Sequence, residues 1–201
     1  VEGDYFKVTY QYINEQRDYN EYPLHGYYLD IEANKFIEKT SPVKHFEIIS
    51  RVEKYIEPFQ NLFLGSSLKG KWATNDFQPY FSQKALGFED YLRGYEYYVI
   101  DGQQYWISKT ILKYVLIENR KFDISFVKMK QFKKSHYSIY FSIFSDIGYV
   151  RDSQNGIENS LSNSFLWGKG VSLDYVTYYD KVLRIEYSMN HLGEKGIFLH
   201  F

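Results

Sequence analysis

The chain has 201 residues, enough for one domain with a sizeable buried core, and its formal net charge of −1 argues against a nucleic-acid partner. It contains no cysteine, which excludes disulfides, thiolate metal sites and cysteine nucleophiles. Aromatic residues make up 20% of the chain, with 22 Tyr, 16 Phe and 3 Trp, and only 4 prolines interrupt it. This composition favours strands.

Hydropathy does not decide whether this chain is soluble. No stretch approaches the roughly 20 consecutive apolar residues that a membrane helix needs. Outer-membrane barrels escape that test, because their lipid-facing residues only alternate with polar residues that face the lumen. The chain also begins without Met and without a signal segment, so we expect a mature product or a piece of one.

Apolar and polar residues alternate with a period of two along much of the chain, which predicts strands with one apolar and one polar face. In Tyr5–Ile13, for example, every second residue from Phe6 to Tyr12 is apolar or aromatic. The alternation predicts strands, and no convincing helix, in chain order near Tyr5–Ile13, Gly26–Phe36, Val43–Glu57, Leu62–Thr74, Gln103–Ile117, Tyr137–Val150, Lys169–Tyr179, Lys181–Asn190 and Gly196–Phe201. Most of these segments suit a tilted membrane-spanning strand of about 9–11 residues better than a usual globular strand of about 5–6.

The connections between these strands alternate in length. The tight turns lie at Pro58–Asn61 and around Asp180, and the long loops at Asn75–Gly102 and Arg151–Gly168. Short turns at one end and long loops at the other are typical of outer-membrane barrels. The exceptions are Asn14–His25 and Glu118–His136. An odd number of strands also does not suit a complete bacterial barrel, so we expect part of a larger one.

Four segments resemble, in the same order, motifs of one protein family. They are "NEQRDYNEYPLHGYYLDIE" (Asn14–Glu32), "LRGY" (Leu92–Tyr95), "FSDIGYV" (Phe144–Val150) and the ending from Glu158 to Phe201. Together they are similar to the C-terminal part of the barrel in the BamA/TamA-like outer-membrane barrel assembly and translocation superfamily, the bacterial surface antigen family. The residues that match its hairpin motif are Arg17, Asp18, Pro23 and Gly26, with Glu15 as the leading acid.

The resemblance implies an all-β fold, an antiparallel transmembrane β-barrel of which residues 1–201 form the C-terminal portion. The family's barrel has sixteen strands, and those predicted here would be the eighth to the sixteenth. The N-terminal strands and the periplasmic POTRA repeats of such proteins are not in this chain. We do not expect the half-barrel to fold alone, because it would expose two edge strands.

The implied function is insertion of other barrel proteins into the bacterial outer membrane. The implied partners are membrane lipids and lipopolysaccharide, unfolded outer-membrane clients, and accessory lipoproteins or other subunits of an assembly complex. Two membrane alternatives stay open: a polypeptide-secretion transporter of the two-partner type and the barrel of a patatin-like phospholipase. The non-membrane alternative is a soluble lipocalin-like binding barrel, whose polar face would point outward and whose apolar face would line a ligand cavity.

In this family, the Leu92–Tyr95 motif lies at the tip of a long loop that folds back into the barrel lumen. Arg93 would be costly toward lipid, but it is tolerable in the lumen if its planar guanidinium finds a fixed carboxylate. Asp146 offers that carboxylate if alternate residues such as Ile147 face outward, and the resemblance implies the same pair. Gly94 permits a positive φ and a close approach to the wall.

The barrel wall is expected to place Asp146, Gly148 and Lys113 opposite this loop, while the leucine and tyrosine of the motif pack around the ion pair. Lys113 stands where relatives often carry a second acid on the neighbouring strand. There it would repel Arg93 or contact Asp146 in its place.

The last strand resembles the signal by which outer-membrane barrels are recognised for insertion, although an ordinary final strand is the alternative. The residues that fit its polar-x-Gly-x-x-apolar-x-aromatic spacing are Glu194, Gly196, Leu199 and Phe201. The tryptophans are expected in an interfacial girdle, with a carbohydrate-binding platform as the alternative. They are Trp72, Trp106 and Trp167.

The sequence does not predict an enzyme. Its histidines are His25, His45, His136, His191 and His200, and they show no metal-binding spacing such as His-Glu-x-x-His. The segment "GSSLKG" (Gly65–Gly70) is not a Gly-x-Ser-x-Gly nucleophile elbow. We therefore expect no catalytic residue, no metal and no cofactor.

Overall fold

The computed structural model describes residues 5–38, 45–74, 83–123, 134–153, 160–177 and 181–201. The strands are β1 (Tyr5–Glu15), β2 (Gly26–Glu38), β3 (His45–Phe59), β4 (Leu62–Ala73), β5 (Lys84–Leu86), β6 (Ile100–Asp101), β7 (Gln104–Asp123), β8 (Lys134–Arg151), β9 (Phe165–Thr177), β10 (Val182–Asn190) and β11 (Lys195–His200). Among these residues there is no helix that could cross a membrane.

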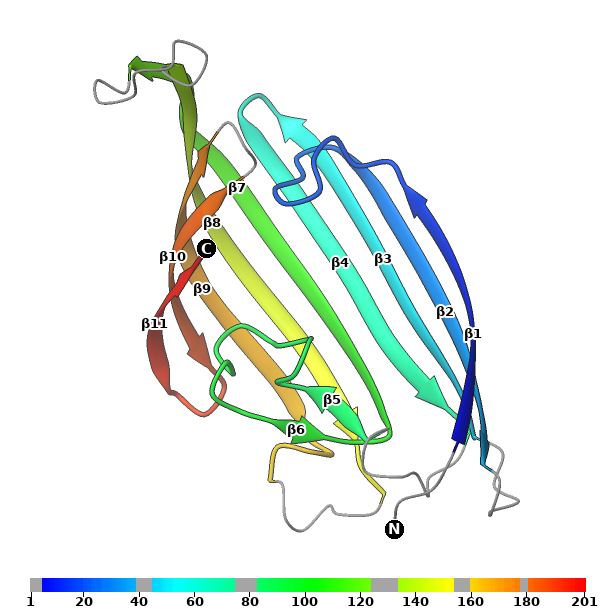
Figure 1. Ribbon diagram of the computed structural model, residues 1–201. Coiled ribbons are helices and arrows are strands. Elements are labelled where there is room, and N and C mark those ends of the chain that lie inside the picture. Colours follow the sequence, from blue (N-terminus) through cyan, green and yellow to red (C-terminus); the bar gives the residue numbers. More distant parts are fainter. Residues whose placement is uncertain (1–4, 39–44, 75–82, 124–133, 154–159, 178–180) are drawn as a thin grey trace.

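Nine strands form one antiparallel sheet in the order β1-β2-β3-β4-β7-β8-β9-β10-β11, and β5 pairs with β6 in a separate small sheet. The large sheet is curved but not closed, so β1 and β11 are its two edges (Figure 1). The prediction of an all-β antiparallel fold is confirmed, and the nine strands of the sheet are the nine that the alternation predicts. The alternation missed β5 and β6 because strands of 3 and 2 residues are too short to show a period.

Two strands are longer than predicted. Strand β7 continues to Asp123 and β8 begins at Lys134, so both ends of the connection expected at Glu118–His136 are strand. Register shifts after Val115 and Ile117 mark bulges, which break the alternation while the pairing continues. Strand β9 begins at Phe165, inside the stretch Arg151–Gly168 that was expected to be a loop.

The two faces of the large sheet differ in character. The loop 83–103 lies against one of them, here called the inner face, and the opposite side is the outer face (Figure 1). The outer face carries exposed apolar side chains on every strand, including Tyr10, Ile31, Val52, Leu68, Tyr114, Ile143, Leu173, Ile185 and Leu199. The inner face carries buried polar side chains, including Asn34, Glu47, Glu53, Lys71, Lys113, Ser142, Asp146, Asp174 and Glu186. The outer face is thus mainly apolar, and the inner face is mainly polar except where the loop 83–103 packs on it.

Aromatic side chains gather on the outer face at the end where β4 stops and β7 starts. Gly70 pairs with Trp106, Trp106 with Tyr149, and Ile147 with Trp167, so the three expected tryptophans lie at similar levels on neighbouring strands. Trp72 is two residues beyond Gly70 on β4, and all three tryptophans are exposed. The three tryptophans thus form one exposed row near this end of the sheet.

The main apolar core lies between the loop 83–103 and the inner face. Its members are Ala85, Leu86, Leu92, Tyr95, Ile100, Tyr105, Ile107, Val150, Leu161 and Leu166. Six of them are at most 2% exposed: Leu86, Leu92, Tyr95, Ile100, Val150 and Leu166. Burial of this apolar surface holds the loop on the sheet and so positions the polar residues of its tip.

Candidate functional site

Arg93 at the loop tip is bound to Asp146 on β8. Its Nε donates to Asp146 Oδ2 at 2.7 Å and its Nη2 to Asp146 Oδ1 at 2.5 Å, a bidentate pair. The guanidinium also lies 3.8 Å from the centre of the Phe144 ring. Asp146 is fully buried and Arg93 is 6% exposed. The structure therefore brings together the pair that the sequence predicted, in the geometry that a guanidinium and not an ammonium can adopt.

Close backbone approach makes this contact possible. Gly94 has a φ of +89° and its carbonyl accepts a hydrogen bond from Asn190 Nδ2 at 3.0 Å. Gly148, a predicted wall residue, leaves room for Leu92, whose Cδ1 would be 3.2 Å from an added Cβ. The sequence analysis missed Gly168 on β9, where a Cβ would lie 1.8 Å from the Arg93 carbonyl oxygen. Only glycine fits between these two backbones.

Tyr95 fixes the other side of the tip. Its hydroxyl contacts His191 Nδ1, accepts a hydrogen bond from the Trp167 amide at 3.3 Å and lies 3.4 Å from the Trp167 carbonyl. Its ring and the Leu92 side chain are buried in the apolar core. All four residues of the Leu-Arg-Gly-Tyr motif thus contact the sheet or lie against it.

Of the two expectations for Lys113, the contact with Asp146 is wrong, while the side chain does line the same cavity as Arg93. Its ammonium donates to the Pro23 carbonyl at 3.0 Å and lies 3.7 Å from the centre of the Tyr22 ring, so it binds the β1–β2 loop instead of Asp146. The residue directly opposite Asp146 is Lys109, which lies four residues, or two periods of the pleat, before Lys113 on β7. Lys113 pairs with Ser142, so the error is one of strand register.

The predicted hairpin motif shapes the β1–β2 loop, residues 16–25. Arg17 binds Glu15 at 2.5 Å and donates to Glu53 on β3 at 2.8 Å. Asp18 Oδ1 accepts hydrogen bonds from the backbone amides of Tyr19 and Leu24, which closes the loop. Gly26 has a φ of +101°, and a Cβ there would lie 2.0 Å from the Gln16 carbonyl oxygen.

This loop reaches across the inner face to the other half of the sheet. Tyr22 donates to Asp174 on β9 at 2.7 Å, and Asp174 also accepts from Arg184 at 2.8 Å and from Ser142 and Ser172. Burial, together with the neighbouring Asp174 carboxylate, raises the pKa of the Tyr22 hydroxyl, so it remains a donor. The sequence analysis named none of Tyr22, Asp174 and Arg184, although Tyr22 precedes the motif proline.

The two inward loops share one polar space. A cavity of about 200 Å³ lies between them on the inner face. Its lining includes Tyr22, Arg51, Glu53, Arg93, Lys109, Lys113 and Arg184. Each loop thus links two parts of the sheet, and we call these links the first and the second brace. The first brace joins the β1–β2 loop to β9 through Tyr22 and Asp174. The second joins the β4–β7 connection to β8 through Arg93 and Asp146.

Tyr22→Phe is expected to loosen the first brace. The change removes one hydroxyl donor and leaves Asp174 with its remaining partners, so we expect a loss of about 1–3 kcal/mol in the free energy of unfolding. Tyr19→Phe is the matched control, because Tyr19 lies in the same loop and is 52% exposed. Denaturant unfolding of both variants measures the difference, and equal stabilities would contradict a bracing role for Tyr22.

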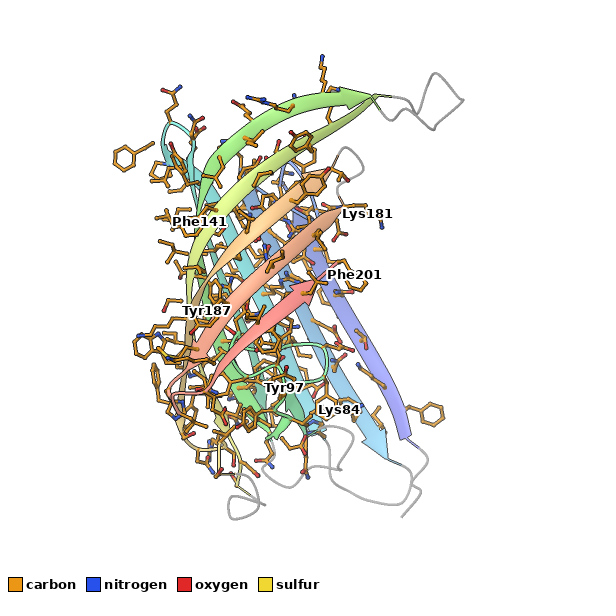
Figure 2. The ribbon with its side chains drawn as sticks, turned by 90° about the vertical axis from the view of Figure 1, so that its left-hand side faces the viewer. Lys84, Tyr97, Phe141, Lys181, Tyr187 and Phe201 are labelled. Atoms are coloured by element: carbon orange, nitrogen blue, oxygen red, sulfur yellow. The ribbon has the colours of Figure 1, made fainter. Side chains whose placement is uncertain are left out.

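The residues of the expected C-terminal signal lie at the free edge of the sheet. Leu199 is exposed on the outer face, where it pairs with Ile185 of β10, and the exposed Phe201 follows the end of β11 (Figure 2). Gly196 pairs with Ser188 on β10. Glu194 has a further contact that the sequence did not indicate, since both its carboxylate oxygens lie 2.8 Å from the Tyr98 hydroxyl of the loop.

Neither a scan against protein-family models nor a search of the curated proteins finds a match to this chain.

Proposed function

We propose that this chain is the C-terminal portion of an outer-membrane β-barrel of the BamA/TamA-like superfamily, and that it takes part in inserting other barrel proteins. The observation that carries the proposal is the Leu-Arg-Gly-Tyr tip folded onto the inner face, with Arg93 bound in bidentate fashion by Asp146. The contact joins two of the four motifs on which the family resemblance rests. A solvated loop arginine would show neither the burial nor the fixed partner.

The sidedness of the sheet supports a membrane location. Exposed apolar residues on all nine strands face outward, while the inner face holds ion pairs whose carboxylates, Asp146 and Asp174, are fully buried. A lipocalin-like binding barrel needs the reverse arrangement, with an apolar interior and a polar exterior. A transmembrane barrel needs an apolar outer band with aromatic residues at its borders, which is the pattern seen here.

The two edges of the sheet support a larger barrel. Strands β1 and β11 each have one side without a partner strand among the described residues. In hydrocarbon every unpaired backbone group costs several kcal/mol, so a membrane sheet must be closed by further strands. Seven more strands would complete the sixteen of the family's barrel.

The β11 edge suggests how such a protein would act. This strand has 6 residues, and where its pairing with the first strand of the complete barrel opens, its backbone can form hydrogen bonds with an incoming strand of a client. Pairing of that kind would let a client fold strand by strand at the edge. The free energy of client folding would then drive insertion, with no nucleotide required.

Reconstitution of the natively expressed polypeptide that carries these residues tests the proposal. We expect lipid vesicles that contain it to accelerate the folding of an unfolded small outer-membrane barrel protein relative to empty vesicles. A folding rate equal to that in empty vesicles would contradict the insertase function. Passage of an unfolded polypeptide into the vesicle interior, without insertion, would instead favour the secretion transporter.

A further inference from the structure

Three potential metal ligands converge where the loop meets the last two strands. Glu96 lies two residues beyond Gly94 in the loop, Glu186 lies on the inner face of β10, and His200 lies on the inner face of β11. One ligand atom from each is within 4.8 Å of the other two. Because the three residues come from three different elements, no spacing along the chain could have indicated the cluster.

The cluster contains polar atoms that lack a partner. Glu186 is 1% exposed, and neither of its carboxylate oxygens has a hydrogen-bond partner. Glu96 Oε1 and His200 Nε2 are likewise buried without a partner. Burying an unpaired carboxylate costs several kcal/mol unless a proton or a cation neutralises it. The geometry therefore leaves a place for a positive charge.

The arginines of the inner face do not supply that charge through a contact. Arg93 directs its bidentate face to Asp146, and Arg184 donates to Asp174 at 2.8 Å and 3.2 Å. The other Glu96 oxygen, Oε2, accepts from the Gly94 amide at 2.8 Å, which fixes that carboxylate toward the cluster. The two guanidinium groups and Glu96 Oε2 thus all have hydrogen-bond partners among the described residues, whereas the Glu186 carboxylate has none there.

We propose that Glu96, Glu186 and His200 bind one divalent transition-metal ion such as Zn²⁺. Two carboxylates and an imidazole form a ligand set that suits Zn²⁺, Mn²⁺ or Fe²⁺. Ligands at about 2.0–2.2 Å from a tetrahedral metal lie about 3.3 Å apart, so the side chains need to close by an ångström or so from their present separation. Water would complete the coordination.

Such a metal would fasten the loop to the free edge of the sheet. The loop already contacts β11 through two ring contacts: the Tyr91 ring stacks on His200 with 6.0 Å between centroids, and the Tyr97 ring lies 5.3 Å from that of Phe198. A metal shared by Glu96, Glu186 and His200 would stabilise the docked position of the loop against β11. The inference does not depend on the insertase function, because it concerns binding alone.

Metal binding by the natively expressed polypeptide, purified in detergent and stripped with a chelator, tests the site. We expect one equivalent of Zn²⁺ per chain in a calorimetric titration, and a Co²⁺ absorption band that Zn²⁺ abolishes. Glu186→Gln and His200→Gln should each weaken binding at least about 100-fold. His136→Gln, which removes a histidine remote from the cluster, should bind as the unsubstituted protein does.

Two results would overturn the proposal. The first is the absence of any Co²⁺ band in the unsubstituted protein, a measurement that does not depend on the folding of a variant. It would indicate that the two carboxylates share a proton. The second is unchanged Zn²⁺ affinity in Glu186→Gln, which would place the bound metal elsewhere. A far-ultraviolet circular dichroism spectrum equal to that of the unsubstituted protein shows that each variant has folded.

Discussion

Arg93→Ala is expected to release the loop tip from the inner face. The substitution removes both hydrogen bonds to Asp146 and the contact with the Phe144 ring, and it leaves a fully buried carboxylate without its cation. Removing one partner of a buried ion pair costs about 3–5 kcal/mol. We expect proteolytic cleavage near Tyr97, which is 83% exposed on this loop, to become much faster as the docked state loses population.

Two further variants separate the ion pair from the loop's other contacts. Arg93→Lys keeps the charge but cannot form the bidentate contact, so it should protect the loop only partly. The double variant Arg93→Ala with Asp146→Ala removes the unpaired carboxylate as well, so it should be less destabilised than Arg93→Ala alone. Equal protease resistance in the unsubstituted protein and in Arg93→Ala would show that the loop is held by its apolar contacts and not by this pair.

Gly168→Ala is expected to have an effect of similar size for a steric reason. The added Cβ would lie 1.8 Å from the carbonyl oxygen of Arg93, so either the loop tip or strand β9 must move. Overpacking in a well-packed site costs about 1–3 kcal/mol, and we expect the upper end or more because both contacting groups are backbone. The expected result is loss of loop protection without any change in the charge of the site.

Gly70→Ala is the matched control for this substitution. Gly70 also lies in a strand of the large sheet, but a Cβ there meets its nearest atom, the Tyr105 carbonyl oxygen, at 3.3 Å. We expect the loop of Gly70→Ala to resist protease nearly as well as that of the unsubstituted protein. Equal loop protection in Gly168→Ala and Gly70→Ala would mean that the tip does not lie against β9 as described.

The sequence predicted the strands and the main contact of the loop because each has a local signal. Period-two alternation survives in every long strand, since one face is apolar along its whole length. The Arg93–Asp146 pair could be predicted because both residues belong to short motifs. Lys113 was placed wrongly because a wall contact depends on register, and four residues along a strand amount to about 13 Å.

The remaining features have no local signal. Tyr22 and Asp174 are 152 residues apart, and their hydrogen bond depends on how far the β1–β2 loop extends across the curved sheet. Gly168 reads as an ordinary loop glycine until the Arg93 backbone is placed beside it. The ligands of the proposed metal site are brought together by curvature and pairing, which spacing along the chain does not encode.

The most direct test of the account uses the absence of cysteine from this chain. Ser67 and Leu68 are neighbours on β4, with Leu68 53% exposed on the outer face and Ser67 on the inner face beside the polar cavity. Each is replaced in turn by Cys, and the natively expressed polypeptide is reconstituted in lipid vesicles and labelled with a fluorophore. If the sheet spans the membrane, a lipid-borne quencher should quench the label at position 68, while a water-soluble quencher should act at position 67. Quenching of both positions by the water-soluble quencher alone would contradict the membrane assignment and the function built on it.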